Sequence, residues 1–163
     1  MSETFVADPE IERIAIARAD SAIRLAAGPF GVALDWSDRS IEQVERILAG
    51  VHADLATRAV DEAKIYALAE TLGSYVGEVY RRNHGATWGN VTLGGETYPG
   101  LRTDNGVLFW PWGRVYNRLV NGAEDNLAWY YHLLLEKTNG PLAQPSDPQP
   151  SDRQPWWKRL FRP

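Results

Sequence analysis

The amino-acid sequence predicts an α+β fold with N-terminal helices, a small antiparallel meander at about residues 86–110, and a C-terminal pair of helices. Two observations predict this order. Apolar residues recur at helical spacing before and after the meander, and the stretch between holds Thr-, Val- and Trp-containing runs separated by Gly and Asn turns. Because strands and helices are grouped along the chain, we expect an antiparallel sheet with helices beside it.

The first helix is predicted to begin at residues 8–10, where Asp-Pro-Glu supplies a capping carboxylate, a proline at the first helical position and an early acid. Gly28 and Pro29 stop it. Residues 31–36 are then predicted to form a short strand. The apolar positions of this helix are Ile11, Ile14, Ala15, Ala22, Ile23 and Leu25.

Two further helices are predicted before the meander. Ser40 and Gln43 match a capping box, in which each side chain bonds a backbone N–H of the first turn. A break is expected around residues 52–58, and the longest helix then runs from about residue 60 to residue 82. Its apolar stripe should face the core and comprises Ile65, Leu68, Ala69, Leu72, Val76 and Val79.

The rest of the domain is predicted as strands followed by helices. Residues 86–93, 97–102 and 107–110 are expected to be three antiparallel strands joined by Gly- and Asn-containing turns. Pro111 then begins a helix. Residues 124–125, an acidic pair, are expected to open the last helix.

The composition changes near Gly140, which divides the chain into one globular domain over residues 1–140, a proline-rich linker over 141–155 and a basic-aromatic tail over 156–163. Six of the ten prolines lie in the last 23 residues. Proline fixes φ and donates no hydrogen bond, so this segment is predicted to be an extended, disordered tether. Its four basic and two acidic residues give it a charge of +2, against −6 for the rest of the chain.

Composition also argues against several function classes. The net charge of −4 disfavours a general nucleic-acid binder, which needs a basic surplus to neutralise phosphates. No apolar run is long enough to span a bilayer, and the lack of cysteine removes disulfides, a thiol nucleophile and thiolate metal sites. The sequence starts with no basic and apolar leader. We therefore expect a cytoplasmic location, with peripheral contact at the inner membrane as the alternative.

Motifs for catalysis or metal binding are sparse. The three histidines are separated by 32 and 48 residues and show no local ligand spacing, so we expect no metal site and no cofactor. Ser74, between Gly73 and Gly77, lacks the Gly-x-Ser-x-Gly spacing of a hydrolase nucleophile. The two glycines are instead predicted to be a packing notch, where another backbone approaches the helix closely.

Glu78 is the candidate catalytic carboxylate. On a helical wheel it lies off the apolar stripe, beside Tyr75 and Arg82. One interpretation is an ion pair with Arg82, four residues on. The other is a partly buried acid at the floor of a groove, with Tyr75, Tyr80 or His84 assisting a hydrolysis or an isomerisation. A strongly raised pKa of Glu78 would favour the second interpretation.

Aromatic residues supply the candidate binding residues of the domain. Trp110, Pro111 and Trp112 straddle a predicted strand-to-helix junction, and the two tryptophans cannot easily face one core. An exposed tryptophan would mark a binding surface. We expect either a groove involving Trp112, Trp88 or Tyr116, or ordinary core and rim packing, with Trp88 itself most consistent with the core.

The tail carries the most specific feature of the sequence. It is too short to form a stable helix alone in water, so we expect it to fold on contact. Anionic lipid would attract its cations by about 1 kcal/mol each, and tryptophans favour the lipid interface. The alternatives are a groove on a partner protein and its own domain. The candidate binding residues are Trp156, Trp157, Lys158, Arg159, Leu160 and Phe161.

Residues 72–79, Leu-Gly-Ser-Tyr-Val-Gly-Glu-Val, and residues 84–88, His-Gly-Ala-Thr-Trp, carry a family resemblance. With Phe-Trp-Pro-Trp at 109–112 and Asn-Gly at 121–122, they resemble an uncharacterised bacterial domain family of unknown function. That family has a GxYxGEV-like helix, a Trp-bearing strand and an aromatic-Pro helix start. The resemblance covers about residues 60–137 and implies a fold rather than an activity. By analogy, some small bacterial domains of this style are toxin-neutralising immunity proteins.

Three hypotheses about function follow. The first is a non-enzymatic, cytoplasmic protein-binding module whose tail docks to a membrane surface or a partner groove. The second is a bacterial immunity protein whose acidic body meets a basic toxin, since complementary charge speeds encounter. The third is a small-molecule hydrolase or isomerase that uses Glu78. No nucleic-acid partner is expected.

Overall fold

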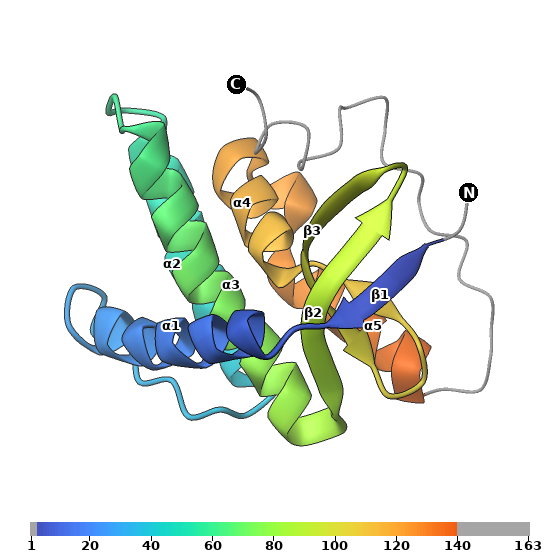
Figure 1. The fold of residues 1–163 in the computed structure, drawn as a ribbon. Helices are drawn as coiled ribbons and strands as arrows, with labels where there is room; N and C mark the ends of the chain where they lie inside the picture. Colours follow the sequence, from blue (N-terminus) through green and yellow to red (C-terminus); the bar gives the residue numbers. More distant parts are fainter. Residues whose placement is uncertain (1–2, 140–163) are drawn as a thin grey trace.

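Helices gather beside a small antiparallel sheet in the computed structural model, which describes residues 3–139 (Figure 1). The four strands lie in the order β1-β2-β3-β4, so the predicted α+β class is confirmed. None of the helices within residues 3–139 combines the length and apolar character that a membrane span requires. The elements are β1 (Thr4–Ala7), α1 (Pro9–Ala27), α2 (Ser40–Leu55), α3 (Glu62–His84), β2 (Ala86–Leu93), β3 (Glu96–Thr103), β4 (Leu108–Phe109), α4 (Pro111–Asn121), the 3₁₀ turn η1 (Ala123–Asp125) and α5 (Leu127–Asn139).

Helix α1 begins as the sequence predicts. The Asp8 carboxylate accepts the backbone N–H of Glu10 at 2.9 Å, and Pro9 occupies the first helical position. After Ala27 the N–H of Gly28 closes the last turn. The helix packs along α3, and its buried stripe is made of small side chains, which let the two backbones approach. This stripe comprises Ala15, Ala19, Ala22 and Ala26.

Residues 31–36 do not form the predicted strand, and this prediction is wrong. The N–H of Val32 bonds back to the carbonyl of Ala26 at 2.8 Å. Trp36 has a φ of 65°, in the left-handed region. A left-handed residue interrupts the extended backbone that a strand needs. The segment is instead a loop that carries the chain from α1 to α2.

Strand β1 has no counterpart among the elements predicted from the sequence. It pairs antiparallel with β2, with Phe5 opposite Val91, and the N–H of Asp8 then donates to the carbonyl of Trp88 at 3.1 Å. The start of α1 is therefore tied to the sheet. A strand of four residues is too short to show alternation in the sequence.

Ser40 begins α2 but does not cap it, so the predicted capping box with Gln43 is wrong. Its hydroxyl donates to the carbonyl of Ser37 at 2.6 Å and shares a hydrogen bond of 2.7 Å with the Tyr75 hydroxyl. Helix α2 has no side-chain cap at this end. The hydroxyl is committed to the preceding turn and to α3, which a local motif cannot reveal.

The predicted meander is confirmed with small shifts in its bounds. Strands β2 and β3 have eight residues each and β4 has two. Gly94 and Gly95 form the first turn with positive φ, and residues 104–106 form the second. Residues 124–125 lie in a 3₁₀ turn, so α5 starts slightly later than predicted, at Leu127.

A buried ion pair holds the C-terminal helices to α2. The Arg118 guanidinium donates to the Glu45 carboxylate at 2.7 Å, and the other oxygen of Glu45 accepts the N–H of Leu127 at 2.8 Å. Both side chains are largely buried. One carboxylate therefore joins α2, α4 and the start of α5.

The register divides the sheet into two faces, because successive side chains of a strand point to opposite sides. The helix-side face packs against α3 and includes Trp88, Leu101 and Phe109, which belong to the hydrophobic core. We call the opposite side the outer face. Its residues are Phe5, Thr87, Gly89, Val91, Tyr98, Gly100 and Arg102.

Gly73 and Gly77 form the predicted packing notch of α3. A Cβ atom on Gly73 would lie 2.7 Å from the Cα of Trp112, so the α4 backbone fills that position. A Cβ on Gly77 would lie 2.6 Å from Cη2 of the Trp88 ring and 2.8 Å from the Leu101 side chain, both too close for real contacts. Only glycine permits these two approaches.

Candidate functional site

Glu78 lies in the middle of α3 with its side chain fully buried, at 0% exposure. Arg81 donates to both of its oxygens, at 2.5 and 2.8 Å, and the indole N–H of Trp88 donates at 3.1 Å. Arg82 adds a weaker ion pair at 3.6 Å. The helical wheel therefore correctly predicts that Glu78 lies beside Arg82, but its main partner is Arg81, three residues after Glu78.

The environment of Glu78 favours its charged form. Burial alone would raise the pKa of the carboxyl, but the hydrogen bonds from Arg81 and Trp88, with the charges of Arg81 and Arg82, outweigh it and lower the pKa. A carboxylate with a lowered pKa is a poor proton acceptor near neutral pH. The contacts of Glu78 are those of a structural ion pair.

Two of the predicted binding aromatics lie in the core. Trp88 is buried beneath α3, and Tyr116 is buried with its ring stacked on Tyr66 at 5.0 Å. Trp112 is half-buried, 6.1 Å from the Trp88 ring, and its N–H donates to the buried Ser74 hydroxyl at 2.8 Å. The structure thus brings Trp88 and Trp112 together, but chiefly inside the domain.

The six predicted binding residues of the tail lie outside the described residues, as does the proline-rich linker. They are Trp156, Trp157, Lys158, Arg159, Leu160 and Phe161.

A polar cluster that the sequence analysis missed joins the loop before α2 to α3 and α5. The Asp38 carboxylate accepts the Tyr131 hydroxyl at 2.6 Å and contacts the His84 imidazole at 2.8 Å. These partners are 93 and 46 residues away in the sequence, so no local motif signals them. Burial raises the pKa of Tyr131, and the Asp38 carboxylate raises it further. Among residues 3–139, the hydrogen-bond partner of the His84 ring is the Asp38 carboxylate.

The left-handed Trp36 is held on both sides by this part of the fold. Its N–H donates to the Tyr75 hydroxyl at 3.0 Å, and its carbonyl accepts Asn83 at 2.9 Å. The Arg82 guanidinium lies 3.6 Å from the centre of its ring. Contacts from α3 therefore hold the backbone of Trp36 on both sides.

The outer face of the sheet is unusual because two strand glycines lie directly opposite each other. Gly89 pairs with Gly100. The Phe5 ring covers the first, with its tip 2.7 Å from where a Cβ would lie, and the Trp110 ring covers the second at 3.1 Å. Aromatic rings laid over strand glycines restore the packing that the missing side chains would supply.

Beside these rings, the outer face carries a second group of buried apolar side chains. Val91 and Tyr98 are opposite each other and are 0% and 2% exposed. Neither belongs to the hydrophobic core that the helices share with the sheet. The Trp110 ring lies 5.5 Å from that of Tyr98, and its N–H is buried without a hydrogen-bond partner among the described residues.

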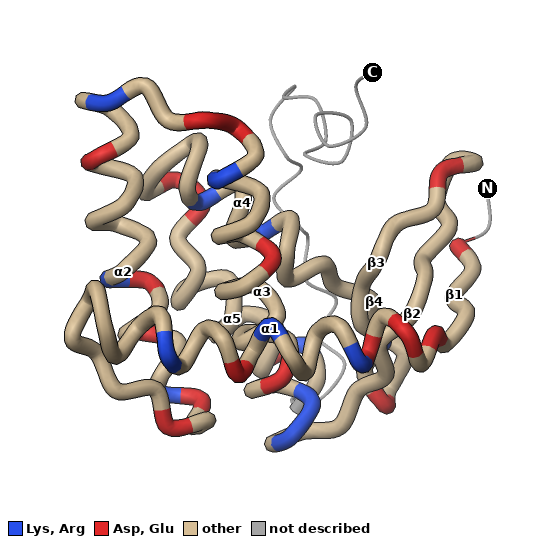
Figure 2. The backbone as a smooth tube through the Cα atoms, turned by 60° about the vertical axis from the view of Figure 1, so that its left-hand side comes forward, with Lys and Arg blue, Asp and Glu red and all other residues tan. Residues whose placement is uncertain are grey.

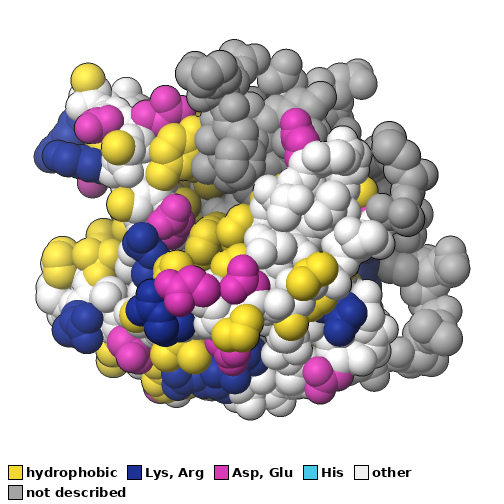
Figure 3. Space-filling model, in the orientation of Figure 1, with side chains coloured by type: hydrophobic (Ala, Val, Ile, Leu, Met, Phe, Trp, Pro, Cys, Tyr) yellow, Lys and Arg dark blue, Asp and Glu magenta, His cyan; other side chains and the backbone are white. Residues whose placement is uncertain are grey.

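Acidic residues stand at one end of the outer face. Burial, followed by the negative charges of Glu3 and Glu96, raises the pKa of Tyr98. Glu96 lies two residues before Tyr98 on β3, and Glu3 directly precedes β1, so the register places both residues at the same end of the sheet. Neither acid forms an ion pair with any residue in the described range. Figure 2 shows acidic positions at the start of β3 and beside the N mark. On the view in Figure 3, charges gather over the helices, and the surface over the strands is mostly uncharged.

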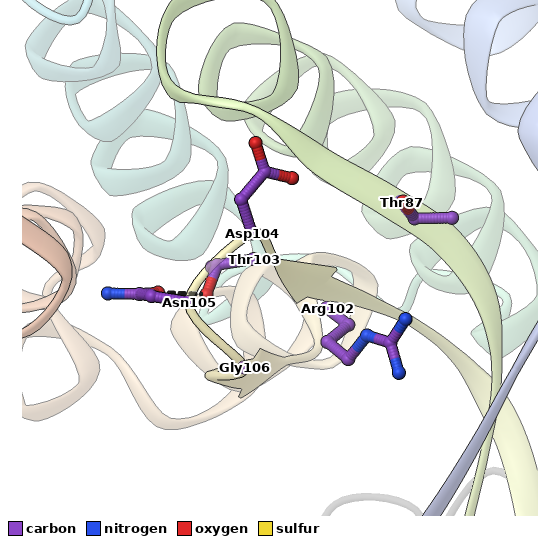
Figure 4. Close-up of a pocket in the computed structure, with 6 residues that line it drawn as sticks. All are labelled: Thr87, Arg102, Thr103, Asp104, Asn105 and Gly106. Carbon is purple, nitrogen blue, oxygen red and sulfur yellow. Dashed lines mark hydrogen bonds between the residues drawn. The ribbon is translucent and has the colours of Figure 1, made fainter.

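A polar depression of about 400 Å³ lies at the other end, by the turn between β3 and β4. Thr87 and Arg102 of the outer face line it, together with Thr103 at the end of β3 and turn residues 104–106. Figure 4 shows that the Asp104, Asn105 and Arg102 side chains point in different directions. Because these side chains diverge, the depression has no set of groups that converge on one ligand atom. Within residues 3–139, no cluster of His, Cys, Asp or Glu could hold a metal ion.

No protein-family model, curated protein or solved structure matches this chain. The resemblance over residues 60–137 therefore stays a prediction. The outer face is the part of the described surface that combines apolar side chains, an unpaired buried donor and uncompensated charge.

Proposed function

We propose that the protein is a non-enzymatic, cytoplasmic binding module that recognises a segment of a protein partner with the outer face of its sheet. The observation that carries this proposal is the second apolar group, Val91 and Tyr98, which is buried outside the core. Burial of apolar side chains is the main source of free energy in protein association. Because these two side chains do not belong to the core that holds the helices to the sheet, this face is suited to recognition.

The chemistry of the face defines the partner segment. The apolar floor and the rings of Phe5 and Trp110 favour aliphatic and aromatic side chains. Glu3 and Glu96 favour cations at one end. The unpaired N–H of Trp110 favours a carbonyl acceptor. An apolar segment with basic residues on one side fits all three features.

The catalytic proposal for Glu78 has less support. Its carboxylate is fully buried, bonded through both oxygens and lowered in pKa. An acid or base for hydrolysis would need a pKa nearer neutrality and access to substrate.

The test is selection of a displayed random-peptide library on the full chain. We expect enriched peptides to carry aromatic and basic residues, and to bind a Tyr98→Ser variant at least about tenfold more weakly, a loss of about 1.4 kcal/mol. The matched control is Trp129→Ser, which removes an aromatic side chain that is 56% exposed on α5. Peptides that bind the Tyr98→Ser variant as tightly as the unaltered chain would contradict the proposal.

A further inference from the structure

We propose that the outer face is occupied by residues 156–163 of the same molecule, so that the chain carries its own ligand for this face. This inference rests on the proposed function of the outer face and names the first occupant of that site. A partner protein would then have to displace the C-terminal segment.

The first argument is apolar complementarity. Val91 and Tyr98 are buried, yet the core formed by the helices does not include them. The Phe5 and Trp110 rings cover the neighbouring glycines. The cover over Val91, which is 0% exposed, therefore comes from outside that core. The C-terminal segment offers four large apolar side chains, namely Trp156, Trp157, Leu160 and Phe161.

The second argument is charge. Glu96 lies two residues before Tyr98 on β3, and Glu3 lies two residues before Phe5 at the start of β1, so the alternation of side chains assigns both positions to the outer face. Neither has an ion-pair partner among residues 3–139. The segment has three basic residues and no acidic residue after position 155. The cations would stand beside the acids when the apolar side chains lie on the face. Opposite charges at the rim of an interface favour this orientation over the reverse.

The third argument is the path of the chain. Helix α5 ends beside the turn between β3 and β4, where the Thr138 carbonyl accepts the Asn105 amide at 2.9 Å. That turn borders the Arg102 end of the outer face. Sixteen residues, 140–155, precede Trp156, and at about 3.1 Å per residue even a proline-rich tether reaches roughly 50 Å. Tyr98 is four residues from Arg102 along β3, or about 13 Å.

Because the segment is tethered to the domain, even weak binding is sufficient for it to occupy the outer face. A linker of this length holds the segment at an effective concentration on the order of millimolar. Docking with a dissociation constant well below that value therefore fills the face in most molecules. The same weak contact leaves the segment replaceable by a partner.

A single spin label tests the proposal on the full chain. The protein has no cysteine, so Gln154→Cys creates one thiol for a nitroxide. We expect the amide signals of Val91 and Tyr98 to lose most of their intensity, whereas Gly50, in α2 away from the strands (Figure 1), keeps its signal. Adding Trp156→Ala and Trp157→Ala should restore the Val91 and Tyr98 signals.

Three outcomes would overturn the proposal. Val91 and Tyr98 could keep full intensity, or they could lose it only when labelled protein is mixed with a separate isotope-enriched copy, which would assign the face to a second molecule. The third outcome is that the Val91 and Tyr98 signals are unaffected while the labelled segment binds phosphatidylglycerol vesicles, which would assign the segment to a membrane.

The two proposals can fail separately. If selected peptides bind through Tyr98 but the label does not approach it, only the docking of residues 156–163 fails. If the label approaches Val91 but no peptide binds, even to the Trp156→Ala, Trp157→Ala chain, the segment is a permanent cover and the recognition function fails.

Discussion

The two faces of the sheet solve the same packing problem in opposite ways. On the helix-side face, the glycine belongs to the helix and the large ring to the strand, since Gly77 leaves room for Trp88. On the outer face, the glycines belong to the strands, and the rings of Phe5 and Trp110 come from an edge strand and a helix start. A large side chain over a glycine gives close packing whichever element supplies it.

The faces differ in how their indole donors are satisfied. The N–H of Trp88 bonds to the Glu78 carboxylate, whereas that of Trp110 is buried without a partner among the described residues. Unpaired buried donors are costly in free energy. The helix-side face is therefore complete within the fold, and the outer face retains the capacity to bind.

The strongest way to break the helix-side face is Glu78→Gln. The substitution leaves Arg81 only its longer ion pair with Glu12, at 3.7 Å, and weakens the bond to Trp88, so we expect a loss of about 3 kcal/mol in the free energy of unfolding. Urea denaturation measures it. An unchanged midpoint would show that the buried carboxylate contributes nothing.

Acid should remove the same contribution from the unaltered chain. Because the pKa of Glu78 is lower in the folded protein than its ordinary value of 4.5, its stabilisation is fully present above that value. It is lost as the pH falls through the folded pKa. The difference in stability between the unaltered chain and Glu78→Gln should therefore shrink in acid. A difference that stays constant down to pH 3 would contradict this assignment.

A smaller effect is expected from Gly77→Ala. The new Cβ overlaps the buried Trp88 ring, and overpacking of about 1–3 kcal/mol outweighs the helix propensity gained. We expect a net loss of about 1–2 kcal/mol. Gly50→Ala is the matched control, because nothing lies within 4 Å of its Cβ position in α2, and it should gain about 0.5–1 kcal/mol. If both variants changed the free energy of unfolding in the same direction, the packing notch at Gly77 would be refuted.

The smallest effect separates the two indole donors. Trp112→Phe and Trp110→Phe remove the same ring atoms, but only the first breaks a hydrogen bond, to the buried Ser74 hydroxyl. We expect Trp112→Phe to cost about 1 kcal/mol more in unfolding free energy. Thermal or urea unfolding of both variants measures the difference. Equal losses would mean that Trp110 also has a bound partner.

The elements that could be predicted are those with local signals. Asp8 and Pro9 mark the start of α1, and the meander is marked by its turns. Trp36 escapes prediction because its left-handed backbone is held by Tyr75 and Asn83, far away in the sequence. Strand β1 was not predictable because its four residues can be recognised as a strand only from their pairing with β2.

The environment of Glu78 was only partly predictable. A helical wheel assumes one buried stripe, but residues 72–80 of α3 are all buried. A carboxylate off the stripe is then enclosed by Trp88 from the sheet and by Arg81 from its own helix. The outer face was not predicted either, because the pairing of Gly89 with Gly100 depends on the register between two strands and the Phe5 ring comes from β1, which was not predicted.

The position of β1 also sets an order of events during folding. The β2–β3 hairpin closes between neighbours, but β1 must find a partner far along the chain, as the Asn90 to Asp8 bond across 82 residues shows. Closing so long a loop costs entropy and slows assembly. Newly made chains should therefore complete the hairpin first and add the N-terminal strand last. Until β1 is added, the Phe5 ring does not cover Gly89, so the outer face is complete only after this last step.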